Sequence, residues 1–192
     1  SMVISLVYNM VDTYFVAQTQ NTNLVAGVSL CAPIFTLMIA LGDIFGIGGS
    51  SVISRLFGQK QDKEGKNVSG FCFYSAIICG ILISILMLIA KDPILTLLGT
   101  NKATLPYASQ YYTYMALGAT LIIVSLTPSN LMRTEGLATE SMLGTITGSI
   151  VNIILDPIFI NIIGFHGAAI ATLISQIICL AFMCIYIYRK KL

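Results

Sequence analysis

Six long apolar runs separated by short polar breaks dominate this sequence, and they limit it to folds in which lipid is the main solvent. A helix needs about 20 mostly apolar residues to cross about 30 Å of hydrocarbon. Hydrophobic residues make up 56% of the 192 residues and charged residues only 9%, whereas a soluble domain carries about 25% charge. The sequence therefore predicts an all-α membrane protein, a six-helix transmembrane bundle. The predicted spans are 2–17, 24–54, 68–90, 107–131, 141–163 and 167–188.

Two of these spans have unusual lengths. The run 2–17 is short at its start, so we expect the chain to be a fragment that lacks the beginning of its first helix. The run 24–54 is longer than one crossing needs, which predicts that it tilts or projects beyond the bilayer.

The basic residues fall mainly in alternate loops. With the N-terminus in the cytoplasm, only Lys91 and Lys102 lie outside, and all the others lie inside. The inside set is Arg55, Lys60, Lys63, Lys66, Arg133, Arg189, Lys190 and Lys191. Because cytoplasmic loops carry an excess of Lys and Arg, eight against two predicts a multi-pass plasma-membrane protein with both ends cytoplasmic.

Several function classes find no support in the residues. A net charge of +2 is too small to suggest a nucleic-acid partner. The five cysteines show no metal-ligand spacing, and no Ser/His/Asp or Cys/His arrangement suggests catalysis. We therefore expect neither an enzyme nor a resident cofactor.

The carboxylate of Asp156 is the most informative polar group. Burying a charge at mid-bilayer costs about 2.5–3.5 kcal/mol, so an acid there suggests a function. Asn152 lies four residues earlier and hence on the same helical face. Pro157 cannot donate, which frees the carbonyl of Ile153. These oxygens suit Na⁺ or a proton.

Asp12 repeats this pattern in the first span. Tyr8 lies one turn earlier on the same face, and Asn9 is close by. Two carboxylates facing one dry cavity cannot both stay ionised cheaply, so a proton or a bound cation is the natural way to neutralise them. The alternative is that such residues only join helices through hydrogen bonds.

Three further positions indicate a polar interior. Asp43, in a Gly-rich stretch, either lines a cavity or caps a local unwinding of its helix. Pro33 and Pro128 fall within predicted spans and free backbone carbonyls, which must face protein or water. Broken helices around a polar midplane are typical of secondary transporters, and the alternative at each proline is a simple kink.

Several segments, in this order along the chain, resemble the N-terminal lobe of the multidrug and toxic compound extrusion (MATE) family. The first is Tyr8–Thr13 (YNMVDT) with Phe15 and Val16. The others are Gly46–Gly58 (GIGGSSVISRLFG), Asp92–Leu95 with Leu98 and Gly99, Leu131–Gly136 (LMRTEG), Asn152–Pro157 (NIILDP) and Gly167–Thr172 (GAAIAT).

The resemblance implies export of cationic, amphipathic drugs in exchange for Na⁺ or H⁺. It places Asp12, Asn152, Asp156 and Thr172 in a cation site, which would hold the metal ion if Na⁺ is the coupling ion. Tyr8 would adjoin this site, and Asn130 would line the same cavity. The family has two six-helix lobes in one chain, so the resemblance implies a second lobe, from the same parent chain or a second copy.

Two other functions stay open. A lipid-precursor flippase of the same superfamily would be expected to show basic cavity residues, whereas Arg and Lys here lie almost wholly in loops. A non-transporting membrane half-protein would have its acids in contact only with other helices. The residues leave open which cation couples and which drugs are carried.

Overall fold

Helices account for nearly all of residues 22–163 and 166–190, the part of the chain that this computed structural model describes. They are α2 (Thr22–Leu30), α3 (Ala32–Gly58), α4 (Asp62–Ile89), α5 (Lys91–Leu97), α6 (Leu105–Thr134), α7 (Ala138–Ile163) and α8 (His166–Lys190). Five stretches of this part are long and apolar enough to cross a membrane. The all-α membrane fold is therefore confirmed, while the predicted span 2–17 lies outside the described residues.

The predicted span 24–54 has a break near its start. The helix stops at a turn, where the N–H of Cys31 donates to the carbonyl of Val28 at 3.0 Å, and α3 begins at the next residue. Pro33 falls in the first turn of α3. Backbone N–H groups there have no acceptor within the helix, so proline costs no helical hydrogen bond. At Pro128, by contrast, α6 continues as one helix, so a broken helix there is wrong.

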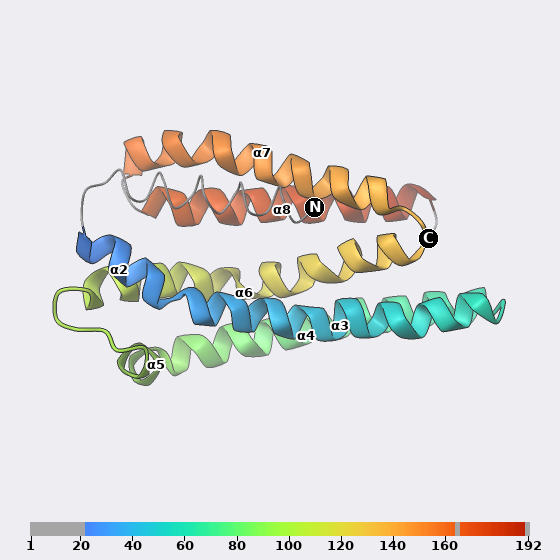
Figure 1. Cartoon of the computed structure of the whole chain (residues 1–192), viewed down its shortest axis with the longest axis horizontal. Coiled ribbons are helices and arrows are strands. Elements are labelled where there is room, and N and C mark those ends of the chain that lie inside the picture. The colour runs from blue at the N-terminus through green and yellow to red at the C-terminus, as the bar shows by residue number, and fades with distance from the viewer. Residues whose placement is uncertain (1–21, 164–165, 191–192) are drawn as a thin grey trace.

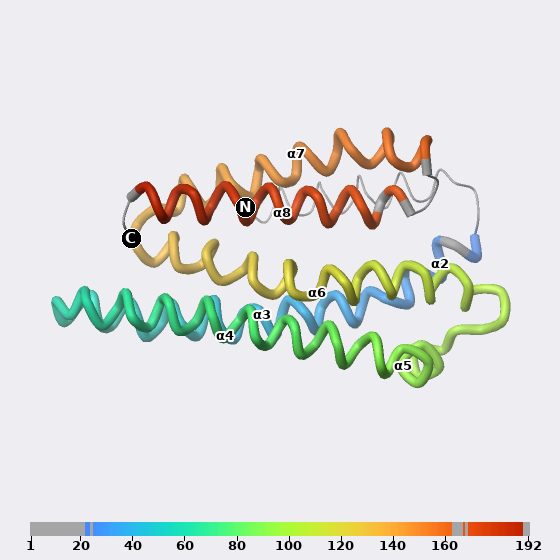
Figure 2. The backbone as a smooth tube through the Cα atoms, turned by 180° about the vertical axis from the view of Figure 1, so that it is seen from behind, coloured from blue at the N-terminus to red at the C-terminus, as the bar shows by residue number. Residues whose placement is uncertain are grey.

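A short helix replaces part of the predicted polar break between residues 91 and 106. In α5, Asp92 and Pro93 occupy the first turn, where an acid and a proline are both favoured. Leu95 is buried against the bundle. Figure 2 shows α5 nearly end-on, so this helix crosses the bundle axis at one end.

Helix α6 is the centre of the bundle. Of its most apolar 18-residue window, 72% is buried, against 22–28% for the other four spans. It contacts α2, α3, α4, α5, α7 and α8. In Figure 1, α7 and α8 lie in one layer, α3 and α4 in another, and α6 between them. The outer helices keep long apolar faces uncovered, as spans bordered by lipid do.

Small residues let α3 approach α6 closely. A methyl group added at Gly42 would lie 2.9 Å from the carbonyl oxygen of Ile123, and one added at Gly46 would lie 2.5 Å from Nδ2 of Asn130. Neither position has room for a Cβ, so the glycines set the distance between the two backbones.

The described segments that carry the basic residues predicted to lie inside are at one end of the bundle. The α3–α4 turn, the α6–α7 turn and the end of α8 come together there, with α3 and α4 reaching past the other helices (Figure 1). The positive-inside rule predicts that these basic segments share one end of the bundle. The side of the membrane that it faces stays a prediction.

Candidate functional site

Asn152 and Asp156 lie one turn apart on α7 and are among the most deeply buried polar residues described. The exposed fraction of Asn152 is 1% and that of Asp156 is 0%. Their four-residue spacing places both on one helical face, and Pro157 follows within the continuous helix. Proline has no N–H, so the carbonyl of Ile153 lacks its usual helical donor beside these side chains.

Two orientations of the Asn152 amide fit the same atom positions, and its hydrogen-bond partners distinguish them. In one, Nδ2 donates to Oγ1 of Thr172 on α8 at 3.3 Å. In the other, Nδ2 donates to Oδ2 of Asp156 at 2.9 Å, and Oδ1 accepts from the backbone N–H of Thr172 at 3.2 Å. The second orientation suits an ionised Asp156, because the first places two acceptor oxygens face to face.

Close packing of α7 on α8 brings these three residues together. A methyl group added at Gly148 would lie 2.9 Å from Cβ of Cys179, and one added at Gly167 would collide with the backbone of Phe159. Glycines on both helices therefore allow the contact between Asn152 and Thr172. The structure thus joins three of the four predicted cation-site residues. Asp12, the fourth, lies outside the described residues, as do Tyr8 and Asn9.

The two remaining predicted residues lie near the contact between α6 and α3, with Asn130 on α6 and Asp43 on α3. Asn130 donates from Nδ2 to the carbonyl of Leu126 at 3.0 Å, and its amide abuts α3 at Gly46. Asp43 is half-buried on α3, one turn before Gly46. Because α3 is continuous there, Asp43 caps no local unwinding, and that alternative from the sequence is wrong.

Sequence reasoning missed a polar contact between α6 and α7. Ser141 donates to the carbonyl of Ser129 at 2.9 Å, and the two hydroxyls lie 3.0 Å apart. The hydroxyl of Thr127, two residues before Ser129, is buried and has no hydrogen-bond partner among the described residues. The run Thr127–Asn130 was a visible signal, because four consecutive residues without a large apolar side chain are unusual inside a span.

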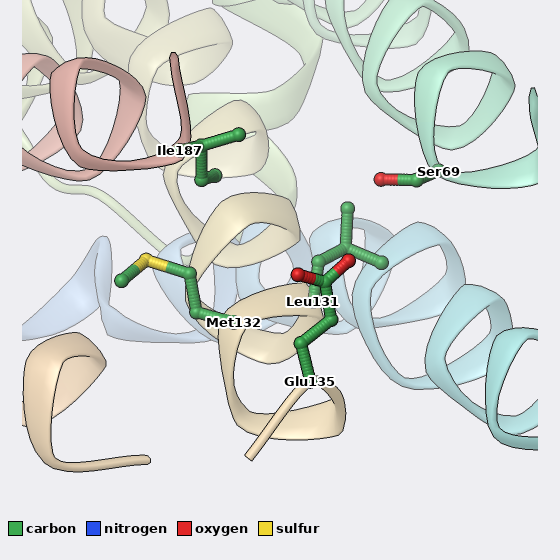
Figure 3. A pocket seen from close by; sticks show the side chains of 5 residues that line it. All are labelled: Ser69, Leu131, Met132, Glu135 and Ile187. Atoms are coloured by element: carbon green, nitrogen blue, oxygen red, sulfur yellow. The ribbon is translucent and has the colours of Figure 1, made fainter. Parts of the chain in front are cut away.

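A small cavity lies at the end of the bundle that holds the basic turns. Its volume is about 20 Å³, enough for one water molecule. Figure 3 shows Glu135 at the end of α6 among the lining side chains, which are Ser69, Leu131, Met132, Glu135 and Ile187. Oε2 of Glu135 is buried without a hydrogen-bond partner among the described residues. Burial raises the pKa of this carboxyl, and the charge of Lys66 opposes that rise.

Known proteins resemble the chain along nearly its whole length. The MatE family model matches residues 1–158. Multidrug export protein MepA of Staphylococcus saprophyticus is 35% identical over 192 residues, which cover 98% of this chain and 42% of MepA.

Solved structures extend the likeness to the backbone. An outward-facing multidrug resistance MATE family transporter of the MOP superfamily superposes with a TM-score of 0.92 at 33% identity, covering 99% of this chain and 42% of that one. An inward-facing structure superposes with a TM-score of 0.87 at 34% identity, covering 94% and 41%. The chain thus spans less than half the length of these proteins.

Proposed function

The chain belongs to the MatE family and corresponds to the N-terminal lobe of a MATE transporter, and on that premise we propose that it is one half of a secondary active multidrug exporter. Its relatives in the family are multidrug exporters rather than enzymes. The proposed cargo is cationic and amphipathic, and the proposed counter-ion is Na⁺ or H⁺. The proposed location is the plasma membrane.

The burial of Asp156 is the observation that carries this proposal. A carboxylate with an exposed fraction of 0% inside a membrane helix is expensive unless a proton or a cation neutralises it. The oxygens around it are an amide, a hydroxyl and a backbone carbonyl without its helical donor. Such hard oxygens suit Na⁺, and the carboxylate alone suits H⁺. Asp12 is proposed as the further ligand of this site.

We infer that the Asn152 amide turns over when Asp156 is neutralised. When Asp156 is ionised and no ion is bound, Nδ2 faces the carboxylate and stabilises it. When a proton or Na⁺ lies between the two residues, Oδ1 can face Asp156, and Nδ2 donates to Thr172 instead. Ion loading would therefore change the contact between α7 and α8.

This change of contact supplies the coupling in the proposed mechanism. An ion can shift a conformational equilibrium only through a different affinity for the two states. The relatives adopt outward-facing and inward-facing conformations. We infer that the ion-loaded amide orientation favours one of them and that drug release accompanies the change.

The charges in the bundle support a cationic cargo. The described Lys and Arg residues lie near helix ends or in turns, whereas Asp43 and Asp156 lie within spans. A lipid-precursor flippase would need a basic interior, which these residues do not provide. The likeness covers only 42% of MepA, so a complete cavity would need a second six-helix lobe, from the same parent chain or a second copy.

Efflux of ethidium from cells that express the full-length parent tests the proposal. Asp156→Asn removes the charge with almost no change in shape, and we expect it to abolish ion-dependent efflux while membrane expression persists. Asp12→Asn should act in the same way. If both variants keep wild-type efflux, the coupling role assigned to these carboxylates is wrong.

A further inference from the structure

Asp43 is a carboxylate that has no partner among the described residues. It lies within the span Val25–Gly58, in the interior of α3, and it is only half-buried. Among the described residues it forms no hydrogen bond and no ion pair. A charge at this depth cannot face hydrocarbon at low cost, so whatever covers Asp43 in the membrane must be polar, charged or wet.

The uncovered surface of α3 has two different sides. One side is apolar and exposed, with exposed fractions of 59% for Leu37 and 62% for Ile44. The other side carries Asp43 and three hydroxyl residues at helical spacing, namely Thr36, Ser50 and Ser54, and it also includes Ile47, which is 55% exposed. We call Asp43 and the three hydroxyl residues the α3 polar stripe. A helix that lies between lipid and a polar cavity has this kind of difference between its two sides.

The hydroxyls of the α3 polar stripe do not form hydrogen bonds with Asp43. Thr36 donates to the carbonyl of Ala32 at 3.2 Å, Ser50 to that of Gly46 at 2.6 Å, and Ser54 to that of Ser50 at 2.8 Å. Each is satisfied within its own helix. The carboxylate of Asp43 therefore stays available to an external group.

Asp43 is also distant from Asn152, Asp156 and Thr172, the polar residues at the contact between α7 and α8. Gly42, its neighbour, packs on Leu126, which lies about one turn from Ser129. Ser129 is bonded to Ser141 near the start of α7. Asp156 lies much farther along α7, so the two carboxylates are on the order of 15 Å apart along the bundle axis. Asp43 is the nearer of the two to the end with the basic turns.

We propose that Asp43 recognises the positive charge of an amphipathic organic cation, at a position on the α3–α6 seam distinct from the coupling-ion site. Its carboxylate binds the ammonium or iminium group. The apolar body of the ligand lies along α3, on the side where Asn130 of α6 abuts Gly46. This inference rests on the proposed function, and it assigns charge selectivity to a residue that takes no part in ion coupling.

Equilibrium binding to the purified full-length parent tests the assignment. The probes are rhodamine 6G, which is cationic, and rhodamine B, which is zwitterionic on the same ring system. We expect Asp43→Asn to weaken rhodamine 6G binding about three- to fivefold, as loss of a partly screened ion pair predicts. Rhodamine B binding should change less than about twofold. Asp43→Glu should restore the selectivity, and Asp62→Asn, which removes an exposed charge at the start of α4, should match the wild type.

Two results would overturn the assignment. If Asp43→Asn leaves the affinity for both dyes unchanged, Asp43 does not recognise the charge. If it weakens both dyes equally, Asp43 has a structural role, such as a contact with the second lobe. Either result leaves the proposed function intact, provided that Asp156→Asn still abolishes ion-dependent efflux. Conversely, selective loss of rhodamine 6G binding in a protein without ion-dependent efflux would support Asp43 and contradict the proposed function.

Discussion

The amide of Asn152 lies 2.9 Å from Oδ2 of Asp156, so the two side chains form one hydrogen-bonded unit on α7. The same amide reaches the backbone N–H of Thr172 at 3.2 Å. A change of charge on Asp156 can therefore alter a hydrogen bond to α8 through a single side chain.

Asn152→Ala should change the affinity for a coupling proton more than Thr172→Val. The first change removes a donor that contributes about 1.5–3 kcal/mol to the ionised, ion-free Asp156, and hence lowers the half-saturating proton concentration about tenfold or more. The second removes only the hydroxyl and keeps the backbone N–H, so we expect about a twofold effect. Ion-dependent efflux in proteoliposomes of the full-length parent measures both. Equal effects would show that the amide does not link Asp156 to α8.

Gly46→Ala should destabilise the contact between α3 and α6. Its Cβ would lie 2.5 Å from Nδ2 of Asn130 and 3.1 Å from the carbonyl oxygen of Leu126. Overpacking of this kind costs about 1–3 kcal/mol. Gly48→Ala is the matched control, because nothing lies within 4 Å of its added Cβ. Thermal melting of the purified parent in detergent compares the two, and an equal melting temperature would contradict the close approach.

Tyr112→Phe should cost about 1 kcal/mol of stability. The buried Tyr112 hydroxyl donates at 2.9 Å to the carbonyl of Met87, in the last turn of α4, where carbonyls lack helical donors. Tyr188→Phe removes a hydroxyl from a side chain that is 85% exposed and should have almost no effect. Melting of both variants tests whether this bond holds α4 to α6.

Glu135→Gln should stabilise the protein, and more so as the pH rises. Burial raises the pKa of Glu135 above its ordinary value of 4.5, so the folded protein holds this proton more tightly than the unfolded chain does. Wild-type stability therefore falls as the pH rises from 4.5 through the folded pKa, and the variant escapes that loss.

Melting temperatures between pH 5 and pH 8 measure this difference. Glu64→Gln, at an exposed position of α4, controls for the loss of one negative charge. A gap between Glu135→Gln and wild type that stays constant across this range would contradict a buried, titrating Glu135.

Particular residues show where sequence reasoning succeeded and where it stopped. The lengths of the apolar runs predicted membrane helices, and the spacing of Asn152 and Asp156 predicted a shared face, because both depend only on helix geometry. The break at Cys31 was one of the two alternatives that Pro33 left open. The helix α5 was not predicted, because turn-forming residues do not show that a side chain such as Leu95 is buried against the bundle.

The sequence by itself determined that this chain is a bundle of membrane helices with acids at depths where they need neutralising, since hydrocarbon thickness and charge burial act on each segment separately. Only the tertiary structure decided which polar groups meet. Thr172 reaches Asn152 and Asn130 abuts Gly46 because glycines distant in sequence set how closely the helices pack. Asp43 has no partner among the described residues. The distance between two helices depends on residues from both of them, so no single run of residues determines it.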